Sequence, residues 1–405
     1  MVHPQRFDPL YGFHHAVQGW IARLTNVRTF TYLFGDSSYI VHYLRGLGYD
    51  LSSVRQTGSN FGVEVKHETP FLSTVGTGTM VSDGLSLLNA DYSGSSFRLR
   101  RTAVAPEAFL GNDIAYPPGA RVGRNCLLAT KVLVPLDGPV REDVGLLGSP
   151  AFEIPRSVRR DRGFDHLWTG AARRRGPAAK LRHNTVTIAW YVLVQWLNLT
   201  GVVGIGVLAG GLHPRFGVFA TAGGIAAALL FSVLFLVLAE RTAQGFRPLR
   251  PRFCSIYDPV FWRHERFWKL SPGRYLALFN GTPFKGLLWR LLGVRVGRRV
   301  FDDGCAMPEK SLVTLGDDVT LNVGSVIQCH SLEDGTFKSD RTTVGAGSTI
   351  GVGAFVHYGV TIGEAAVVDA DAFLMKGSVT APGSRWRGNP ATEIAGEPVA
   401  PGRWS

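Results

Sequence analysis

The stretch TTVGAGSTIGVGAFVHYGVTIGEAAVVDADAFL, residues 342–374, places an aliphatic residue at every sixth position. Small residues and glycine occupy many of the positions between them. In a parallel β-helix, three such hexads make one triangular coil of about 18 residues, with the aliphatic side chains stacked inside and small residues at the tight corners. The aliphatic positions are Val344, Ile350, Val356, Ile362, Val368 and Leu374. The pattern predicts a parallel β-helix, because the strands of a β-sandwich are not held to a single spacing.

The same period starts upstream, at Leu315, Leu321 and Ile327, and then breaks in QCHSLEDGTFKSD, residues 328–340. The break introduces a histidine, two adjacent acids and a lysine. Loops that leave a rigid scaffold commonly carry function. We therefore expect the functional site to lie on this excursion from the coil.

The hexad region occurs twice in the chain. Residues 70–154 align with residues 310–394 at a constant offset of 240, so that GSPAFEI at 148–154 falls on GNPATEI at 388–394. Upstream, FDPLY near the N-terminus is answered by YDPVF, and LRGLG by WRLLG. The chain is therefore a duplicated unit, each copy an aromatic-rich helical lead-in followed by a six-residue repeat.

Two apolar runs separate the copies. No charged residue occurs from Asn184 to Leu212 or from Phe216 to Ala239. Each run is longer than the about 20 residues that cross a bilayer, and neither has the polar stripe of a soluble helix. The link GGLHPR is short, which predicts a transmembrane hairpin.

Basic sequence flanks the predicted hairpin on both sides, RSVRRDRGFDHLWTGAARRRGPAAKLRHN before it and four arginines after it, whereas the link carries only Arg215. By the positive-inside rule both flanks are cytoplasmic, where they also attract anionic lipid. This explains much of the net charge of +12, and no nucleic-acid-binding motif accompanies it. The N-terminus has no signal-peptide pattern.

The four cysteines are scattered and form no CxxC pair. This spacing fits a reducing compartment and argues against a zinc site or disulfide bonds. We therefore expect no metal site.

We predict a mainly β fold with two parallel β-helix domains, each with a helical lead-in, separated by a transmembrane helical hairpin. The expected divisions are a partly interfacial lead-in (1–58), a first, non-catalytic β-helix unit (59–156), a basic juxtamembrane linker (157–183), the hairpin (184–240), a second lead-in (241–298), a second, catalytic unit (299–396) and a tail (397–405).

Several stretches carry a family resemblance. TAPGSRWRGNPATEI, residues 380–394, is similar to the closing segment of hexapeptide-repeat acyltransferases. More widely, LFGDSSYIVHYLRGLGYDL, CSIYDPVFWRHERFWKLS and CHSLEDGTFKSD resemble the membrane-embedded C-terminal region of ε-poly-lysine synthetase and related nonribosomal peptide synthetases. The resemblance implies left-handed β-helices and membrane-tied acyltransferase-like domains that join amino-acid units delivered as carrier-bound thioesters. That family has three tandem units, whereas this sequence contains two.

Four residues are candidates for catalysis. His330 begins the excursion, and histidine suits the removal of a proton from an amine near neutral pH. Glu333 or Asp334, on the same loop, would orient the imidazole and stabilise its cation. The resemblance also supports His330, since hexapeptide acyltransferases use a loop histidine as general base. The alternative is a histidine satisfied in a surface turn, but the matching residue of the first unit is Ala90. His357 either lines the same cleft or is simply exposed.

Seven further residues are candidates for binding the substrate or a phosphopantetheine arm, with plain solvation or a structural corner as the alternatives. They are Lys338, Asp340, Arg341, Asn322, Arg385, Arg387 and Asn389. For the two asparagines the structural role is favoured, because asparagine tolerates left-handed backbone geometry. His67 and Glu68 precede the first β-helix, but the sequence supplies no partner for a second site there.

We expect a membrane-anchored acyl or aminoacyl transferase that forms amide or isopeptide bonds from a phosphopantetheine-linked thioester, with His330 as base. Its partners would be the carrier and adenylation modules of a nonribosomal peptide synthetase, membrane lipid and a further β-helix unit, from a second copy or another chain. Two alternatives stay open: a transferase that moves an acetyl group from acetyl-CoA to a sugar or amine, and a non-enzymatic membrane scaffold.

Overall fold

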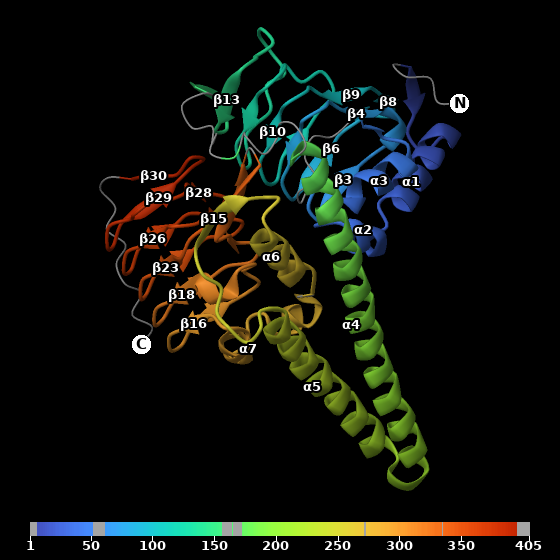
Figure 1. Cartoon of the computed structure of the whole chain (residues 1–405), viewed down its shortest axis with the longest axis vertical. Helices are drawn as coiled ribbons and strands as arrows, with labels where there is room; N and C mark the ends of the chain where they lie inside the picture. Colours follow the sequence, from blue (N-terminus) through green and yellow to red (C-terminus); the bar gives the residue numbers. More distant parts are fainter. Residues whose placement is uncertain are drawn as a thin grey trace.

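The computed structural model of the chain describes residues 6–51, 61–155, 164, 172–270, 273–333 and 335–394. Two β-helices lie next to each other, and a long pair of helices projects from them (Figure 1). Asp334, the predicted tail and most of the predicted basic linker lie outside the described residues.

The second unit is a triangular coil, because its strands form three separate sheets, one for each side, in which the coil strands pair in parallel. The first side contains β16 (Arg295–Val296), β18 (Val313–Leu315), β23 (Thr342–Val344) and β26 (Thr361–Ile362); the second β17 (Phe301–Asp302), β19 (Thr320–Leu321), β24 (Thr349–Ile350), β27 (Val367–Val368), β29 (Arg385–Arg387) and β30 (Thr392–Glu393); the third β20 (Val326–Ile327), β25 (Phe355–Val356) and β28 (Phe373–Leu374). The hexad prediction is confirmed, since all nine aliphatic positions from Leu315 to Leu374 are buried in one core.

The first unit repeats this architecture. Its sides contain β2 (Asp50–Leu51), β4 (Ser73–Val75) and β9 (Thr102–Val104); β5 (Met80–Val81), β10 (Phe109–Leu110), β12 (Leu127–Leu128), β13 (Val144–Leu147) and β14 (Phe152–Pro155); and β3 (Val65–His67), β6 (Leu85–Leu87) and β11 (Ala115–Tyr116). The aliphatic positions Val75, Val81, Val104 and Leu110 are buried as their counterparts are. The internal duplication predicted from the sequence is thus a duplication of the fold, and the left-handed sense of the coils stays a prediction from the resemblance.

Partway along its length, each unit leaves its coil in an antiparallel hairpin. The predicted excursion at 328–340 is the hairpin of β21 (His330–Glu333) and β22 (Thr336–Ser339), with β15 (Arg252–Ser255) as third strand. In the first unit the matching sheet contains β7 (Ala90–Ser93), β8 (Ser96–Leu99) and β1 (Phe7–Pro9). The excursion is therefore ordered by strand pairing.

Short helices make up the two lead-ins and cap the coils. They are α1 (Phe13–Thr25), α2 (Arg28–Phe34) and α3 (Tyr39–Leu47) before the first unit, α6 (Pro259–Leu270), η3 (Gly273–Phe279) and α7 (Phe284–Leu292) before the second, and the 3₁₀ turns η1 (Pro70–Leu72) and η4 (Lys310–Leu312). The C-caps of α3 and α7, Gly48 and Gly293, have φ of 109° and 106°, a left-handed geometry that suits glycine.

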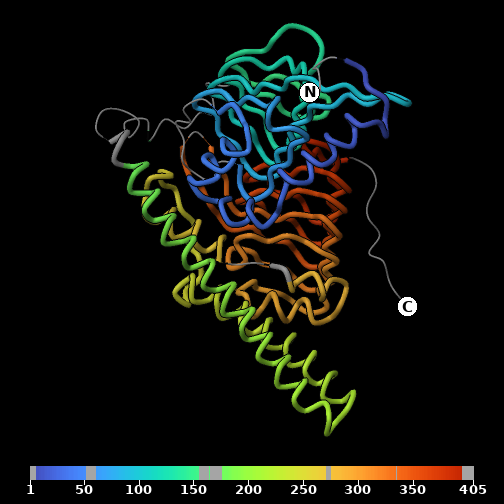
Figure 2. Tube along the Cα trace, turned by 90° about the vertical axis from the view of Figure 1, so that its right-hand side faces the viewer, coloured from blue at the N-terminus to red at the C-terminus, as the bar shows by residue number. Residues whose placement is uncertain are grey.

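The apolar middle of the chain forms two antiparallel helices, α4 (Ala172–Phe216) and α5 (Val218–Ala243), joined at Gly217. By length and composition, the segments Gly176–Phe216 and Val218–Ala243 suffice to cross a membrane. Figure 2 shows the stacked coils of the second unit edge-on, with the two helices running past them and projecting beyond. The first half of α4 packs on protein: His183 contacts the carbonyl oxygen of Trp262 in α6, and Asn184 donates a hydrogen bond to Ser38.

The two units meet through different sides of their coils. The sheet that contains β10 and β12 in the first unit faces the sheet of β20, β25 and β28 in the second. Leu147 of the first unit packs there with Phe355 and Phe373 of the second. Asn112 Nδ2 donates to Gln328 Oε1 at 2.9 Å, beside this apolar contact.

Candidate active site

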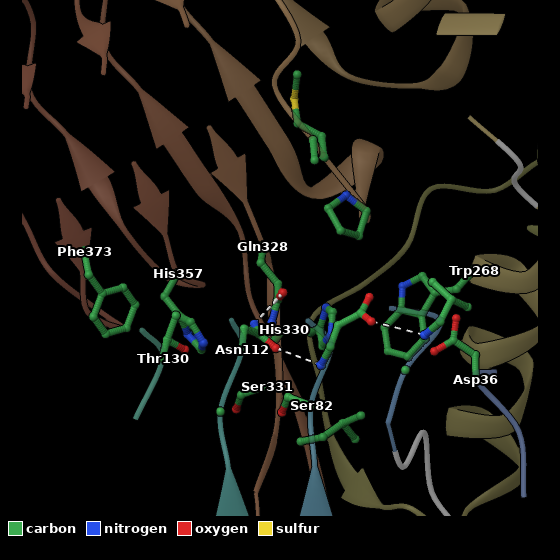
Figure 3. A pocket seen from close by; sticks show the side chains of 18 of the residues that line it. Asp36, Ser82, Asn112, Thr130, Trp268, Gln328, His330, Ser331, His357 and Phe373 are labelled. Atoms are coloured by element: carbon green, nitrogen blue, oxygen red, sulfur yellow. Dashed lines mark hydrogen bonds between the residues drawn. The ribbon is translucent and has the colours of Figure 1, made fainter. Parts of the chain in front are cut away.

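A cavity of about 560 Å³ lies at the junction of the two units. Side chains from both units line it, with those of Ser82, Asn112 and Thr130 on the first and of His330 and His357 on the second (Figure 3). Asn112 meets its lining partner Gln328 across the gap, as Figure 3 shows. The cavity is therefore a property of the pair of units.

His330 stands at the first position of β21, where the chain leaves the coil for the hairpin. Its Nδ1 lies 2.8 Å from Oε1 of Glu309, and its ring packs on Trp268 with centroids 4.4 Å apart. The imidazole side chain is 14% exposed, toward the cavity that it lines. Since Nδ1 faces the carboxylate, Nε2 is the nitrogen left for a substrate.

Glu309 is fully buried directly before η4 and is held from several sides. Oε2 accepts a hydrogen bond from the backbone N–H of Cys329 at 2.9 Å, and Oε1 accepts one from Trp268 Nε1 at 2.6 Å. His264 Nε2 lies 3.6 Å from Oε1. Burial by itself raises the pKa of Glu309, but the neighbouring imidazoles of His330 and His264 outweigh it and hold the pKa well below its ordinary range. The pocket therefore keeps a carboxylate ionised beside an imidazole, the arrangement of a positioned general base.

The loop acids were expected to provide this carboxylate, and the structure places another residue there. Glu333 lines the cavity but forms an ion pair with Lys376, with Oε2 and Nζ 2.9 Å apart. Burial raises the pKa of Glu333, and the nearby ammonium of Lys376 more than offsets this, so the pKa is lowered. Glu309 aligns with Thr69 of the first unit, so the signal that could have found it was the exchange of a neutral residue for an acid.

His357 lines the cavity from β25's end of the coil, so the lining alternative holds over simple exposure. It is 7% exposed, packs near Phe373 and has no hydrogen-bond partner at Nδ1. Burial lowers its pKa to about 3. The ring is therefore neutral at pH 7, and Nδ1 can serve a bound ligand.

The predicted binding residues do not line this cavity. Their contacts are Arg385 and Arg387 with Asp369, Asn322 with the carbonyl oxygen of Ile350, Asn389 with the carbonyl oxygens of Thr130 and Lys131, Lys338 over the Phe253 ring, and Asp340 with the backbone N–H of Arg341. Asn322 contacts the backbone of the next coil and Asn389 joins the two units, but neither has the left-handed backbone geometry for which a structural role was expected.

The first unit contributes more than its sequence suggested. Asp36 and Asp83 line the cavity, and burial together with the charge of Asp36 raises the pKa of Asp83 to about 8. Asp83 aligns with Val323 of the second unit, so the exchange of an apolar residue for an acid marked this position. His67 and Glu68 lie apart from the cavity: Glu68 binds the backbone N–H of Ala90, and His67 is buried.

Within the described residues, no group of three or more histidine, cysteine, aspartate or glutamate side chains is arranged to hold a metal ion. The four cysteines are free and buried.

Among solved structures, the chain is similar to hexapeptide-repeat acetyltransferases. One, from Vibrio cholerae O1 biovar eltor in complex with acetyl coenzyme A, is 19% identical with a TM-score of 0.26, covering 30% of this chain and 82% of that one. Another, a maltose O-acetyltransferase from Clostridium difficile 630, is 17% identical with a TM-score of 0.28, covering 38% of this chain and 95% of that one.

No family model matches the chain. Over 387 residues, 91% of its length, the chain is 23% identical to a delta-poly-L-ornithine synthetase of Acinetobacter baumannii (strain AB307-0294), and it spans 27% of that protein. The resemblance to poly-amino-acid synthetases stated from the sequence is confirmed by this match.

Proposed function

We propose that the chain is an acyl or aminoacyl transferase that forms an amide or isopeptide bond from a thioester, with His330 as general base. The observation that carries the proposal is the contact of His330 with the buried, ionised Glu309 at the wall of a cavity built by both units. The similarity to a poly-L-ornithine synthetase supports the same class of reaction.

In the proposed reaction, a neutral amine in the cavity attacks the carbonyl carbon of the thioester. The C–N bond forms and the C–S bond breaks, so that the thiolate leaves. His330 accepts a proton from the attacking nitrogen at Nε2 and passes it to the thiolate, while Glu309 stabilises the imidazolium in between. A positioned base of this kind typically contributes about 10²- to 10⁴-fold in rate.

The proposed donor is a phosphopantetheine-linked thioester on a carrier of a nonribosomal peptide synthetase, and the second candidate is acetyl-CoA. Purified chain in nanodiscs would be incubated with each donor and an amine or sugar acceptor, and products identified by mass spectrometry. Amide product from the loaded carrier, lost in His330→Ala, supports the proposal. Acetylated acceptor from acetyl-CoA alone would replace it with the conventional transferase. If product formation were unaffected by every substitution in the β21–β22 hairpin, the non-enzymatic scaffold would be favoured.

We place α4 and α5 in the cytoplasmic membrane, with both β-helices in the cytosol. The composition of the two helices and the basic flanks support this arrangement. Cysteines introduced at the exposed Ser93 and Thr343 should resist a membrane-impermeant thiol reagent in intact cells, whereas a cysteine at the exposed Arg215, next to the turn at Gly217, should react. Labelling of either β-helix from outside the cell would contradict the proposed topology.

A further β-helix unit is the proposed protein partner. In the contact, the first unit uses the side that contains β10 and β12, and the second uses a side that is not its equivalent. Each unit therefore leaves open the side that the other unit uses, and these two open sides could bind a further unit in the same way. Asn112 and Phe373 lie in the contact, and their equivalents at the offset of 240, Val352 and Leu133, are 51% and 56% exposed. Mass measurement in nanodiscs should find a second copy or a synthetase unit bound. A fully active, monodisperse monomer would contradict this.

A further inference from the structure

Helix α7 has apolar residues on two faces. Its inner face, with Leu288, Trp289 and Leu292, packs into the core of the second unit. Its outer face carries Phe284 and Leu287, which are 61% and 51% exposed, and the partly exposed Leu291. A soluble helix normally turns charged or polar residues outward, so the outer face calls for an apolar surrounding.

The outer face of α7 continues the exposed apolar surface of α5. Val233 and Leu236 of α5 belong to the same core as the inner face of α7. At the end of α5, Arg241 Nε donates to the carbonyl oxygen of Leu291 at 2.9 Å. The two helices therefore touch, and Leu234 and Leu238 in the last three turns of α5 are exposed.

The length of the hairpin places the membrane boundary at this level. The 21 residues of α5 from Val218 to Leu238 rise about 31 Å at about 1.5 Å per residue, close to the about 30 Å of a hydrocarbon core. On α4, the same number of residues runs from Phe216 back to Trp196, an exposed aromatic residue of the kind that collects at interfaces. Charged residues resume beyond Leu238, with Glu240 and Arg241.

The segment before α7 is fixed at this boundary too. Tyr275 in η3 donates a hydrogen bond to Oδ1 of Asn198 in α4 at 3.0 Å. At the end of η3, Leu278 is 65% exposed, so it extends the apolar surface of α7. By contrast, α1 lies far from the tip of the hairpin in Figure 1, although Phe13 and Trp20 are exposed on it.

We propose that η3 and α7 form a lipid-binding rim, with Leu278, Phe284, Leu287 and Leu291 inserted into the cytoplasmic leaflet. The inference rests on the membrane position proposed above and commits to lipid because this face is continuous with the hairpin. The proposal also bears on the position of the cavity, because Leu276, Ala277 and Asn280, in the segment from η3 to α7, line the cavity. The cavity then lies close to the membrane surface.

Three single-cysteine variants of the full chain in nanodiscs test the rim, each labelled with an environment-sensitive fluorophore. The native cysteines are buried, so the label reports the introduced site. The rim position is Leu287→Cys, the hairpin reference is Leu208→Cys and the matched control, an exposed leucine of the first unit, is Leu133→Cys. Lipids that carry a nitroxide quencher in the acyl chain are then added.

Quenching at Leu287→Cys and Leu208→Cys but not at Leu133→Cys is the expected result. Quenching at Leu208→Cys alone overturns the rim and leaves the membrane hairpin standing. If no position is quenched, the membrane position itself is wrong. A blue-shifted but unquenched label at Leu287→Cys would mean that protein, for example a second copy, covers the helix instead of lipid.

Discussion

The β7–β8 hairpin of the first unit and the β21–β22 hairpin of the second share a fold but differ in chemistry. Both leave the coil at equivalent positions and both pair with a strand from the lead-in. In the second unit the hairpin begins with His330, backed by Glu309; in the first the equivalents are Ala90 and Thr69. The first unit still has a carboxylate at this place, since Glu68 Oε2 accepts from the backbone N–H of Asn89, as Glu309 Oε2 accepts from that of Cys329. The comparison teaches that the exchange of histidine for alanine removes the candidate base while the scaffold and a nearby carboxylate remain.

The first unit nevertheless has a role in the site. It supplies Ser82, Asp83 and Asn112 to the cavity wall, which the second unit could not close by itself. The lead-in helices differ in burial: most residues of α6 are buried, whereas α1 exposes Phe13, Trp20 and Leu24. One unit thus brings the proposed base and the other completes its enclosure.

The largest expected effect is the loss of the histidine. His330→Ala should lower the transfer rate by about 10²- to 10⁴-fold, because the general base is removed, while the coil stays folded. The matched control is Asp91→Asn in the hairpin of the first unit, which should keep the parent rate. Rates would be measured by product formation from a loaded carrier. A His330→Ala rate within about threefold of the parent would end the assignment.

A smaller loss of transfer rate should distinguish the roles of Glu309 and Glu333, the two carboxylates near the β21–β22 hairpin. Glu309→Gln should lower kcat by about 10- to 100-fold with little change in KM, since a charge-assisted contact is typically worth about 1.5–3 kcal/mol. Glu333→Gln, whose partner is Lys376, should cost less. Glu309→Asp should rescue part of the rate. An equal or larger loss in Glu333→Gln would restore the loop acid as the partner of His330.

Buried histidines in both units should make the fold sensitive to acid. Burial lowers the pKa of His67 to about 4 and that of His357 to about 3, from an ordinary 6.5. The unfolded chain therefore binds more protons below pH 6.5, and stability falls as pH drops from 6.5 toward 4 and 3. For His67 the contribution is on the order of 3 kcal/mol.

Thermal unfolding in detergent across this range would show the effect. His67→Phe and His357→Phe should each flatten the slope relative to the parent, and between pH 4 and 3 only the second variant should still do so. A slope unchanged in both variants would contradict the buried neutral state.

The smallest effect is expected where the units are joined by charge. Lys131 Nζ lies 2.6 Å from Oδ1 of Asp371, but the carboxylate is 80% exposed. Such pairs are typically worth about 0–1 kcal/mol, so Lys131→Ala should leave activity within about twofold. Unfolding in denaturant and the transfer assay would both be measured. A tenfold loss of activity would contradict this prediction and show that the contact between Lys131 and Asp371 determines the shape of the cavity.

The sequence by itself determined the coil, the duplication and the apolar helices. An aliphatic residue at every sixth position predicts a repeating coil, because such a coil buries every one of these positions. Leu321, Ile350 and Val368 do stack in adjacent strands. The sequence also singled out His330, because its equivalent in the first unit is alanine.

Only the tertiary structure decided what surrounds that histidine. Glu309 precedes it by 21 residues, and the chain has to complete a coil before the two side chains meet. Asn112 and Gln328 touch across 216 residues of sequence. Helix α4 begins at Ala172, twelve residues before the predicted span, and its basic first part packs on α6 through His183. The local periodicity determines which side chains point inward. Which coils and helices face one another depends on long-range packing, and the repeat pattern contains no information about it.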